Sequence, residues 1–326
     1  MRVCVTGGTG FLGGALVRRL LAEHVPVRVF ARPSHRADEL EARGAEVMRG
    51  ELGDAEAVAR AVRGTELVYH VAAKVDSAGT EADFFETNVS GTERVLTACR
   101  EQGVRRVVYE SSIAVYGLVR NGEHIDENTP FDEFPKLRDS YSQSKLAADE
   151  LASSFARRTG FPVVIMRPGI IYGPGKPLPI GLLAFNLGKG TFVFGSADSH
   201  FPLNYVENLI DAMQMAANLE GEQLREFNIV DDEELTLGHY HDAKSKLDHT
   251  RTRYFPGWPV LLAAPVAEAL ARVLPLGDTR LSTHQLKRSL QDRFYDTRRI
   301  REQTGWTPKV LLEESIRRTL ETPKHG

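Results

Sequence analysis

The sequence predicts an α/β fold in which a doubly wound parallel sheet is followed by a smaller, mostly helical C-terminal lid. Short, uninterrupted apolar runs alternate with amphipathic segments through the first half of the chain. Such runs are typical of strands that are buried on both faces of a parallel sheet. A glycine-rich turn follows the first run, at the sheet edge where ligands bind in this fold class. Beyond residue 167 the alternation becomes irregular, which favours a second, smaller part.

The predicted elements follow this alternation in order. Strands are expected at residues 1–6, 25–31, 45–50, 66–73, 105–112, 161–167 and 227–232. Helices are expected at residues 11–23, 55–62, 81–102 and 141–159, where apolar residues recur with helical spacing. Right-handed crossovers between parallel strands then place helices on both faces of the sheet.

Composition narrows the class of protein. The chain has 326 residues, 42% hydrophobic and 26% charged, which is ordinary for a globular protein. A formal net charge of −3 gives no basic surface for nucleic acid. Cys4 and Cys99 lie in apolar stretches without the spacing of metal ligands or a disulfide framework. We expect neither a signal peptide nor a transmembrane segment, and a cytoplasmic location.

The glycine-rich turn Thr6–Gly13 predicts a dinucleotide site. Gly7 allows the sharp turn, Gly10 lets the backbone approach a pyrophosphate, and Gly13 permits close packing of helix and strand. The helix start offers free N–H groups and the positive end of its dipole. The predicted cofactor-binding residues in this turn are Thr6, Gly7, Gly10, Phe11, Leu12 and Gly13.

The end of the second predicted strand indicates which nicotinamide cofactor is preferred. An acidic residue there would bind the ribose 2′-hydroxyl, whereas an arginine accommodates a 2′-phosphate. The strand ends at Arg32, and Ser34 and Arg36 supply further donors nearby. The sequence therefore predicts NADP, with NAD as the alternative.

A serine, a tyrosine and a lysine form the candidate catalytic set. Tyr141 and Lys145 are four residues apart, so they share one face of the predicted helix. Ser112 ends the fifth predicted strand, at the ligand-binding edge of the sheet, and Ser111 competes for the same role. The pKa of an unperturbed tyrosine is about 10, and a nearby ammonium favours its phenolate. Such a tyrosine can exchange a proton with a substrate oxygen while the serine hydroxyl orients that oxygen.

Together these motifs resemble the extended short-chain dehydrogenase/reductases, in the NAD(P)-dependent epimerase/dehydratase superfamily. The matching pieces run along nearly the whole chain: TGGTGFLG, VYHVAAKV, NVSGT, ESSIAVYG, YSQSK, RPGIIYGPG, LNYVENLIDA, FNIVDD and YDTRRIREQTGWTPKVLLEESIRRT. The resemblance implies Ser112 as hydroxyl partner, Tyr141 as acid/base and Lys145 as its activator. It also implies cofactor contacts, counting the tyrosine and the lysine, at Leu52, Ala72, Ala73, Lys74, Asn88, Tyr141, Lys145, Pro168, Gly169 and Ile171. The family often has an aspartate near the adenine at the end of the third strand, where this chain has Glu51, and the longer side chain either keeps or loses that contact.

The resemblance also divides the chain. Residues 1–167, with a return segment of about 191–232, are expected to form the NADP-binding Rossmann domain. Residues of about 168–190 and 233–326 are expected to form the substrate-binding subdomain. Homodimers are common in the resembled family, packed through helices that correspond to Asp83–Arg100 and Tyr141–Thr159.

Departures from the family pattern bear on the substrate. Sugar-nucleotide epimerases of this family carry an arginine–aspartate pair before the segment matching NYVEN, and here the stretch SADSHFPLNYVEN has no arginine. HVAAKV is close to the branch of 3-beta-hydroxysteroid dehydrogenase-like enzymes and ketone reductases. The expected function is NADP-dependent interconversion of a secondary alcohol and a ketone on a largely apolar, steroid-like or β-keto substrate. The alternatives are a sugar-nucleotide epimerase or dehydratase and a non-catalytic NADP-sensing protein.

Two further segments are open to more than one interpretation. Three interpretations of the apolar stretch Trp258–Leu276 are open: it packs as an ordinary helix, it lines the substrate pocket, or it touches a membrane surface. In His239-Tyr240-His241 the two histidines would share a face if the run were a strand. No third ligand accompanies them, so no metal site is predicted.

Overall fold

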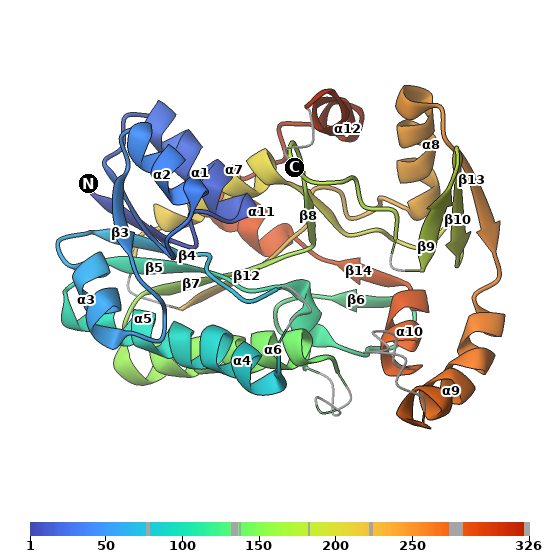
Figure 1. Ribbon diagram of the computed structural model, residues 1–326, viewed down its shortest axis with the longest axis horizontal. Helices are drawn as coiled ribbons and strands as arrows, with labels where there is room; N and C mark the ends of the chain where they lie inside the picture. Colours follow the sequence, from blue (N-terminus) through green and yellow to red (C-terminus); the bar gives the residue numbers. More distant parts are fainter. Residues whose placement is uncertain are drawn as a thin grey trace.

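A computed structural model describes residues 1–75, 79–131, 136, 138–181, 183–221, 224–273 and 283–322, and the side chains of 266–273, 284 and 285 are outside this description. Its centre is a seven-stranded sheet in the order β12-β7-β5-β4-β1-β2-β3. Every neighbouring pair in it is parallel. The predicted doubly wound parallel sheet is therefore confirmed (Figure 1).

The first half of the chain alternates strands and helices as predicted. Its elements are β1 (Val3–Thr6), α1 (Phe11–Ala22), β2 (Val27–Ala31), α2 (His35–Ala42), β3 (Glu46–Arg49), α3 (Ala55–Val62), β4 (Leu67–His70), α4 (Glu81–Phe85), the π-helix η1 (Glu86–Ser90), α5 (Gly91–Glu101), β5 (Arg106–Glu110), the 3₁₀ turn η2 (Ile113–Tyr116), β6 (Glu123–Ile125), α6 (Ser140–Thr159) and β7 (Val163–Pro168).

The second half is less regular. It contains β8 (Ile170–Tyr172), β9 (Ala184–Leu187), β10 (Gly190–Phe194), β11 (Leu203–Tyr205), α7 (Val206–Ala217), β12 (Arg225–Ile229), α8 (Leu237–Asp248), β13 (Arg251–Phe255), α9 (Trp258–Val273), α10 (Thr283–Leu290), β14 (Arg293–Tyr295), α11 (Arg298–Thr304) and α12 (Leu312–Glu321).

Apolar side chains cover both faces of the large sheet. On one face, α1, α7 and α11 enclose a core that includes Leu16, Leu209 and Trp306, all fully buried. On the other, α3, α5 and α6 enclose a core that includes Val95 and Ile165. Figure 1 shows these two helical layers above and below the sheet. Burial on both faces explains why the strands are continuous apolar runs.

Three small sheets lie outside the large one: β13-β10-β9, β11-β8 and β14-β6. None of them was predicted from the sequence, which indicated a mostly helical second part. The predicted helix at 81–102 contains a π-helical segment in its middle, η1. The run His239-Tyr240-His241 belongs to α8, so its two histidines do not share the face of a strand. His239 is exposed there and His241 is buried.

The strand pairing bears on the expected division of the chain, which stays a prediction. β9 and β10 lie in the separate sheet with β13, whereas β12 returns to the large sheet beside β7. β8 and β11 form a separate parallel pair, with Ile170 opposite Leu203 and Tyr172 opposite Tyr205.

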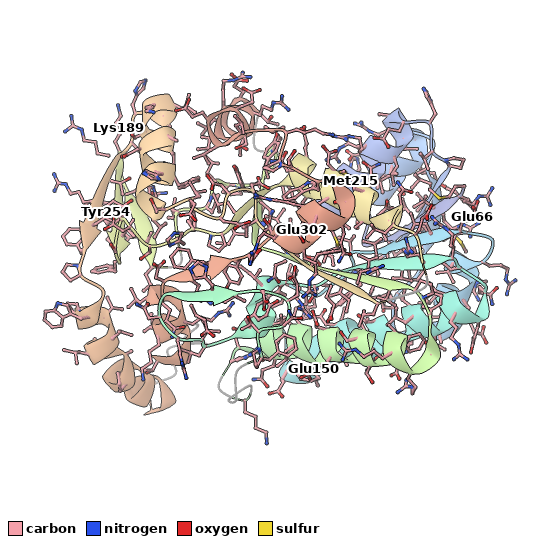
Figure 2. All side chains as sticks on the ribbon, turned by 180° about the vertical axis from the view of Figure 1, so that it is seen from behind. Glu66, Glu150, Lys189, Met215, Tyr254 and Glu302 are labelled. Atoms are coloured by element: carbon pink, nitrogen blue, oxygen red, sulfur yellow. The ribbon has the colours of Figure 1, made fainter. Side chains whose placement is uncertain are left out.

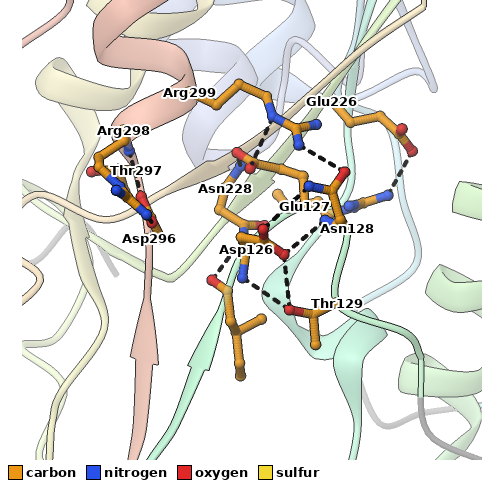
Figure 3. A network of polar contacts seen from close by, with 12 residues as sticks. Asp126, Glu127, Asn128, Thr129, Glu226, Asn228, Asp296, Thr297, Arg298 and Arg299 are labelled. Carbon is orange, nitrogen blue, oxygen red and sulfur yellow. Dashed lines mark hydrogen bonds and ion pairs between the residues drawn. The ribbon is translucent and has the colours of Figure 1, made fainter.

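A polar network around the Glu127 carboxylate joins the loop after β6 to the large sheet and to α11 (Figure 3). The Asn228 amide N–H on β12 donates to Glu127 Oε1 at 2.9 Å. The Arg299 side chain from α11 pairs with Glu127 Oε2 at 3.2 Å and donates to Asn128 Oδ1 at 2.9 Å. Because desolvation dominates, burial raises the pKa of the Glu127 carboxyl. One nearly buried carboxylate thus connects three segments that are far apart in sequence.

Candidate functional site

The glycine-rich turn leads from β1 directly into α1. Gly7 has a φ of +71°, and a Cβ added there would lie 2.7 Å from the Ala72 Cα. A Cβ at Gly13 would lie 2.3 Å from the Gly7 carbonyl oxygen. A larger residue at either position would displace backbone, because real Cβ atoms do not approach so closely. The close packing expected of Gly13 is present.

The turn leaves room for an anion at the start of α1. Gly10 is the N-cap residue, is exposed, and has no side chain to cap the helix. Among the described residues other than its two chain neighbours, a Cβ at Gly10 would meet only the Gly7 carbonyl oxygen within 4 Å, at 3.2 Å. The first N–H groups of an α-helix lack internal partners, and they attract phosphate. The residues present therefore fit the pyrophosphate of a dinucleotide, and Phe11 and Leu12 stand in the same first turn.

The loop after β4 is held by internal hydrogen bonds. Thr6 Oγ1 contacts His70 Nδ1 at 2.8 Å and accepts from the Ala72 N–H at 3.3 Å. Asn88 Oδ1 accepts from the Lys74 N–H at 2.7 Å, and its Nδ2 donates to Ser144 Oγ at 2.9 Å. The Thr6 and Asn88 side chains, both predicted to contact cofactor, thus shape the loop 71–74 that borders the glycine turn.

The predicted 2′-phosphate residues lie just beyond β2. Arg32 and Arg36 are exposed. The Ser34 hydroxyl oxygen accepts from the Ala37 N–H at 3.3 Å and so caps α2. Within the described residues Arg32 has no ion pair, so its guanidinium remains open to an incoming anion.

The remaining predicted cofactor residues border the same edge of the sheet. Glu51 is exposed and Leu52 half-buried, directly after β3. Gly169 links β7 to β8, and its N–H donates to Asn204 Oδ1 at 2.6 Å. Pro168 and Ile171 lie on either side of it, at the end of β7 and within β8.

The two neighbouring serines after β5 differ in what they contact. Ser111 is buried and donates to Asp149 Oδ2 at 2.6 Å, next to the ion pair of Asp149 with Arg167. Ser112 is half-buried and caps η2, with its Oγ accepting from the Ala114 N–H at 3.1 Å. Desolvation raises the pKa of the Tyr141 phenol, and the Ser112 side chain acts in the opposite direction. Because the Ser111 hydroxyl is engaged by Asp149, Ser112 is the better candidate for the hydroxyl partner of the tyrosine.

Tyr141 and Lys145 come together on α6, as their spacing predicted. Desolvation raises the pKa of the Tyr141 phenol above its usual value, and the Lys145 ammonium acts in the opposite direction. Lys145 is buried, with its Nζ donating to the Glu110 carbonyl oxygen at 2.6 Å and lying 3.3 Å from Glu110 Oε2. It also lies 5.1 Å from the centre of the Tyr109 ring. The Lys145 ammonium is therefore held between the Glu110 carboxylate and the Tyr109 ring, within electrostatic reach of the Tyr141 phenol.

Two charged residues at this edge were not predicted from the sequence. Glu110 directly precedes the two serines, and desolvation raises the pKa of its carboxyl, an effect opposed by Lys145. Lys176 follows β8, where its Nζ donates to the Ile171 carbonyl oxygen at 3.0 Å and lies 5.2 Å from the Phe11 ring centre. Glu110 had a sequence signal, because it ends the strand that carries the serines. Lys176 had none, since its loop has no periodicity.

Only the start of the apolar stretch Trp258–Leu276 is described in full. Trp258 and Leu262, at the start of the apolar stretch, are 63% and 69% exposed, whereas Ala264 is buried. Within this stretch, the residues beyond Val273 and the side chains beyond Pro265 lie outside the described residues.

In the part of the chain that is described, no three His, Cys, Asp or Glu residues form a group that could hold a metal ion. No described helix is long and apolar enough to cross a membrane.

Known proteins resemble this chain in both sequence and fold. Residues 3–230 match the model of the NAD dependent epimerase/dehydratase family. A 2-alkyl-3-oxoalkanoate reductase of Shewanella oneidensis is 28% identical, over 96% of this chain and 84% of its own length. The 3beta-hydroxysteroid-dehydrogenase/decarboxylase isoform 2 of Arabidopsis thaliana is 29% identical over 98% of this chain, which spans 62% of the plant protein. The crystal structure of a UDP-glucose 4-epimerase of Thermotoga maritima superposes with a TM-score of 0.74 at 20% identity, covering 98% of each chain.

Proposed function

Because this chain belongs to the NAD-dependent epimerase/dehydratase family, we propose that it is an NADP-dependent reductase that interconverts a secondary alcohol and a ketone on a largely apolar substrate. Family membership makes it a nicotinamide-dependent enzyme of the short-chain dehydrogenase/reductase type. The observation that supports the rest is that α6 carries both Tyr141 and Lys145 and that Lys145 Nζ donates to the Glu110 carbonyl oxygen, at the end of the strand that leads to Ser112.

The chain's own residues would handle the proton and the orientation of the substrate. Bound nicotinamide supplies or accepts the hydride at the substrate carbon. In the direction of ketone reduction, the Tyr141 hydroxyl gives its proton to the carbonyl oxygen. In the direction of alcohol oxidation, the Tyr141 phenolate takes the proton back. Ser112 donates a hydrogen bond to the same oxygen. Lys145 stabilises the phenolate, since an adjacent ammonium favours the charged form.

The preference for NADP rests on Arg32, which is exposed at the end of β2 and has no ion pair among the described residues. No acidic side chain occupies the position that would bind a ribose 2′-hydroxyl. Ser34 and Arg36 would add donors to a 2′-phosphate. NAD is the alternative cofactor, and the family name itself refers to NAD.

An apolar carbonyl substrate is favoured by the relatives. The bacterial relative is a 2-alkyl-3-oxoalkanoate reductase, and the plant relative is a 3beta-hydroxysteroid dehydrogenase/decarboxylase. The absence of an arginine from SADSHFPLNYVEN argues against a sugar nucleotide. Sugar-nucleotide conversion remains the second candidate, because the chain shares its fold with a UDP-glucose 4-epimerase. The described tyrosine–lysine pair argues against a purely NADP-sensing role.

We further propose a homodimer that packs through α4, η1, α5 and α6. The support is family analogy together with the position of these helices, which form one continuous layer on a single face of the large sheet (Figure 1).

The deciding experiment follows cofactor absorbance with purified protein, supplied with NADP or NAD. The substrates are hydroxysteroids, β-hydroxy acids and sugar nucleotides. We expect reduced NADP to accumulate with an apolar alcohol. Conversion of a sugar nucleotide without accumulation of reduced cofactor would show the epimerase or dehydratase alternative instead.

Tyr141→Phe tests the acid/base role. Removal of the hydroxyl leaves no group to exchange the proton, so kcat should fall by about 10²-fold or more while NADPH binding stays nearly unchanged. Turnover is measured by cofactor absorbance and binding by NADPH fluorescence. The matched control is Tyr109→Phe, a buried neighbour that we assign no role in proton transfer. Full turnover in Tyr141→Phe would remove this residue from the mechanism.

A further inference from the structure

The three-stranded sheet β13-β10-β9 has one covered face and one open face. Its inner face carries Val193, which is buried, and Tyr254, whose ring meets that of His241 on α8 at 6.1 Å. Figure 1 places α8 beside this sheet, at the end of the molecule opposite the N-terminus. Because side chains alternate along a strand, the neighbouring positions must point the other way, away from α8.

Aromatic and aliphatic side chains fill this other face. The register places Phe185 opposite Phe192, Leu187 opposite Gly190, and Phe194 opposite Phe255. Phe185 and Phe192 stack with ring centres 5.3 Å apart, and Phe194 and Phe255 are 5.8 Å apart. We call Phe185, Leu187, Phe192, Phe194 and Phe255 the aromatic face.

The aromatic face remains in contact with solvent. Phe185 is 48% exposed and Leu187 is 69% exposed. Directly after β13, the first turns of α9 add Trp258 and Leu262, at 63% and 69%. Single exposed apolar residues are ordinary, but a contiguous group of them indicates a binding surface.

Positive charges accompany the aromatic face, and none of the described residues assigned to this face is acidic. The register places Arg251 opposite Gly190 and Arg253 opposite Phe192, so both arginines lie on this face. Lys189 stands in the turn between β9 and β10, and Figure 2 shows it at the same end of the molecule as Tyr254. The sequence has no Asp or Glu within 184–194 or 251–265. Within the described residues none of these three cations has an ion pair.

We propose that the aromatic face, together with Trp258 and Leu262, docks on the surface of an anionic lipid bilayer. Aromatic rings and leucines can enter the boundary of the acyl chains while lysine and arginine contact anionic headgroups. A second copy of this chain fits less well. A two-fold interface on this face would bring Arg251 and Arg253 close to their own copies, with no carboxylate on the face to separate them.

The test is co-sedimentation of the full chain with vesicles. Vesicles of phosphatidylcholine with phosphatidylglycerol are compared with vesicles of phosphatidylcholine alone, at low and high salt. We expect binding to the anionic vesicles that weakens as salt screens the headgroups. Arg251→Glu with Arg253→Glu should lower the partition coefficient by about tenfold or more. Leu187→Ser should lower it by about threefold or more.

Matched controls separate docking from general effects. Arg43→Glu with Arg60→Glu changes net charge equally on the exposed helix ends of α2 and α3. Leu311→Ser removes a leucine that is 71% exposed elsewhere, against 69% for Leu187. Both controls should bind vesicles like the original chain, and the cofactor-linked turnover of all variants with a water-soluble substrate should be unchanged.

Three outcomes would overturn the docking proposal. One is the absence of binding to anionic vesicles. Another is equal loss of binding in the control pair and in the Arg251/Arg253 pair. The third is a concentration-dependent dimer in sedimentation velocity that Leu187→Ser abolishes, because a second copy would then cover the face. None of these outcomes bears on the oxidoreductase proposal, which is tested on turnover alone.

Discussion

At the scale of single residues, the sequence located the candidate site but could not resolve which side chain of a neighbouring pair faces it. Ser111 and Ser112 are equally placed at a strand end, and the direction of a side chain there depends on the twist of the chain after the strand. In the structure Ser111 turns to Asp149 and Ser112 to the side of Tyr141. Glu110 was overlooked because a strand-end glutamate is usually solvated, whereas this one pairs with a buried lysine.

Arg32→Asp tests the cofactor preference. The change removes a charge-assisted hydrogen-bond donor and adds a charge that repels a 2′-phosphate, so NADPH should bind about 10- to 100-fold more weakly. NADH binding should change little, or improve through the 2′-hydroxyl. Both affinities are measured by fluorescence titration, with exposed Arg43→Asp as the control. Equal loss for both cofactors would contradict the assignment of Arg32.

Glu110→Gln tests how the carboxylate affects the tyrosine. Lys145 lowers the pKa of the Tyr141 phenol, whereas Glu110 raises it. Removal of the negative charge should therefore lower that pKa. In alcohol oxidation, activity rises with pH as the phenolate forms, so this limb of the pH–rate profile should move to lower pH. In ketone reduction, activity falls as the phenol ionises, and this limb should move to lower pH as well.

The control for this shift is Glu56→Gln, which removes an exposed carboxylate in the first turn of α3, at a residue with no assigned role in the site. Its profile should keep its position along the pH axis. A profile of Glu110→Gln that keeps its position too, or moves to higher pH, would show that Glu110 does not act on Tyr141.

At the scale of elements, continuous apolar runs predicted the strands of the large sheet because both of its faces are buried. The small sheet β13-β10-β9 escaped prediction for the opposite reason. β13 reads RTRYF, with polar residues at its start, and it pairs with β10 across more than fifty intervening residues. Such pairing depends on tertiary contacts, and no local pattern records it. The histidine run illustrates the same limit, because a short segment fits strand and helix equally well.

Gly13→Ala tests the requirement for close packing in the glycine turn. The new Cβ would lie 2.3 Å from the Gly7 carbonyl oxygen, so the turn must shift. We expect a loss of about 1–3 kcal/mol in the free energy of unfolding, as for other overpacked sites. Cofactor affinity should fall by about tenfold or more, since the shift moves the N–H groups aimed at phosphate.

Chemical denaturation and fluorescence titration measure the two effects. The control is Gly53→Ala, where the nearest atom to an added Cβ is Glu86 Oε1, 4.0 Å away. Normal cofactor binding by Gly13→Ala would mean that the turn tolerates a side chain and that the interpretation of Gly13 as a residue required for cofactor binding is wrong.

At the scale of the whole molecule, segments that are far apart in the sequence are connected through polar contacts as well as apolar packing. Arg299 is the single cation in the described network that pairs with Glu127, whose side chain is 3% exposed. Arg299→Met should lower the free energy of unfolding by about 1–3 kcal/mol at neutral pH, because the carboxylate stays buried without its partner. The loss should shrink as pH falls, since Glu127, with its pKa already raised, can take up a proton.

Denaturant titrations at several pH values provide the measurement. Arg298→Met is the matched control, because this neighbouring side chain is 78% exposed and its ion pair with Asp296 contributes little. A loss of stability in Arg299→Met that is equal at all pH values would mean that packing of the arginine stem, and not the charge of Glu127, sets the cost.

The parallel pairing of β8 with β11 has a consequence for how such a protein diversifies. It fixes both ends of the segment 173–202, which leaves one end of this short strand pair and re-enters at the other, while the large sheet pairs independently through β7 and β12. That segment could therefore be exchanged between relatives as a cassette, provided that the register of β10 with β13 is kept. Recombination at these two points would alter this end of the protein without rebuilding the large parallel sheet. The architecture thus lets evolution, or a protein engineer, vary one end of the molecule while the chemistry at the other is inherited intact.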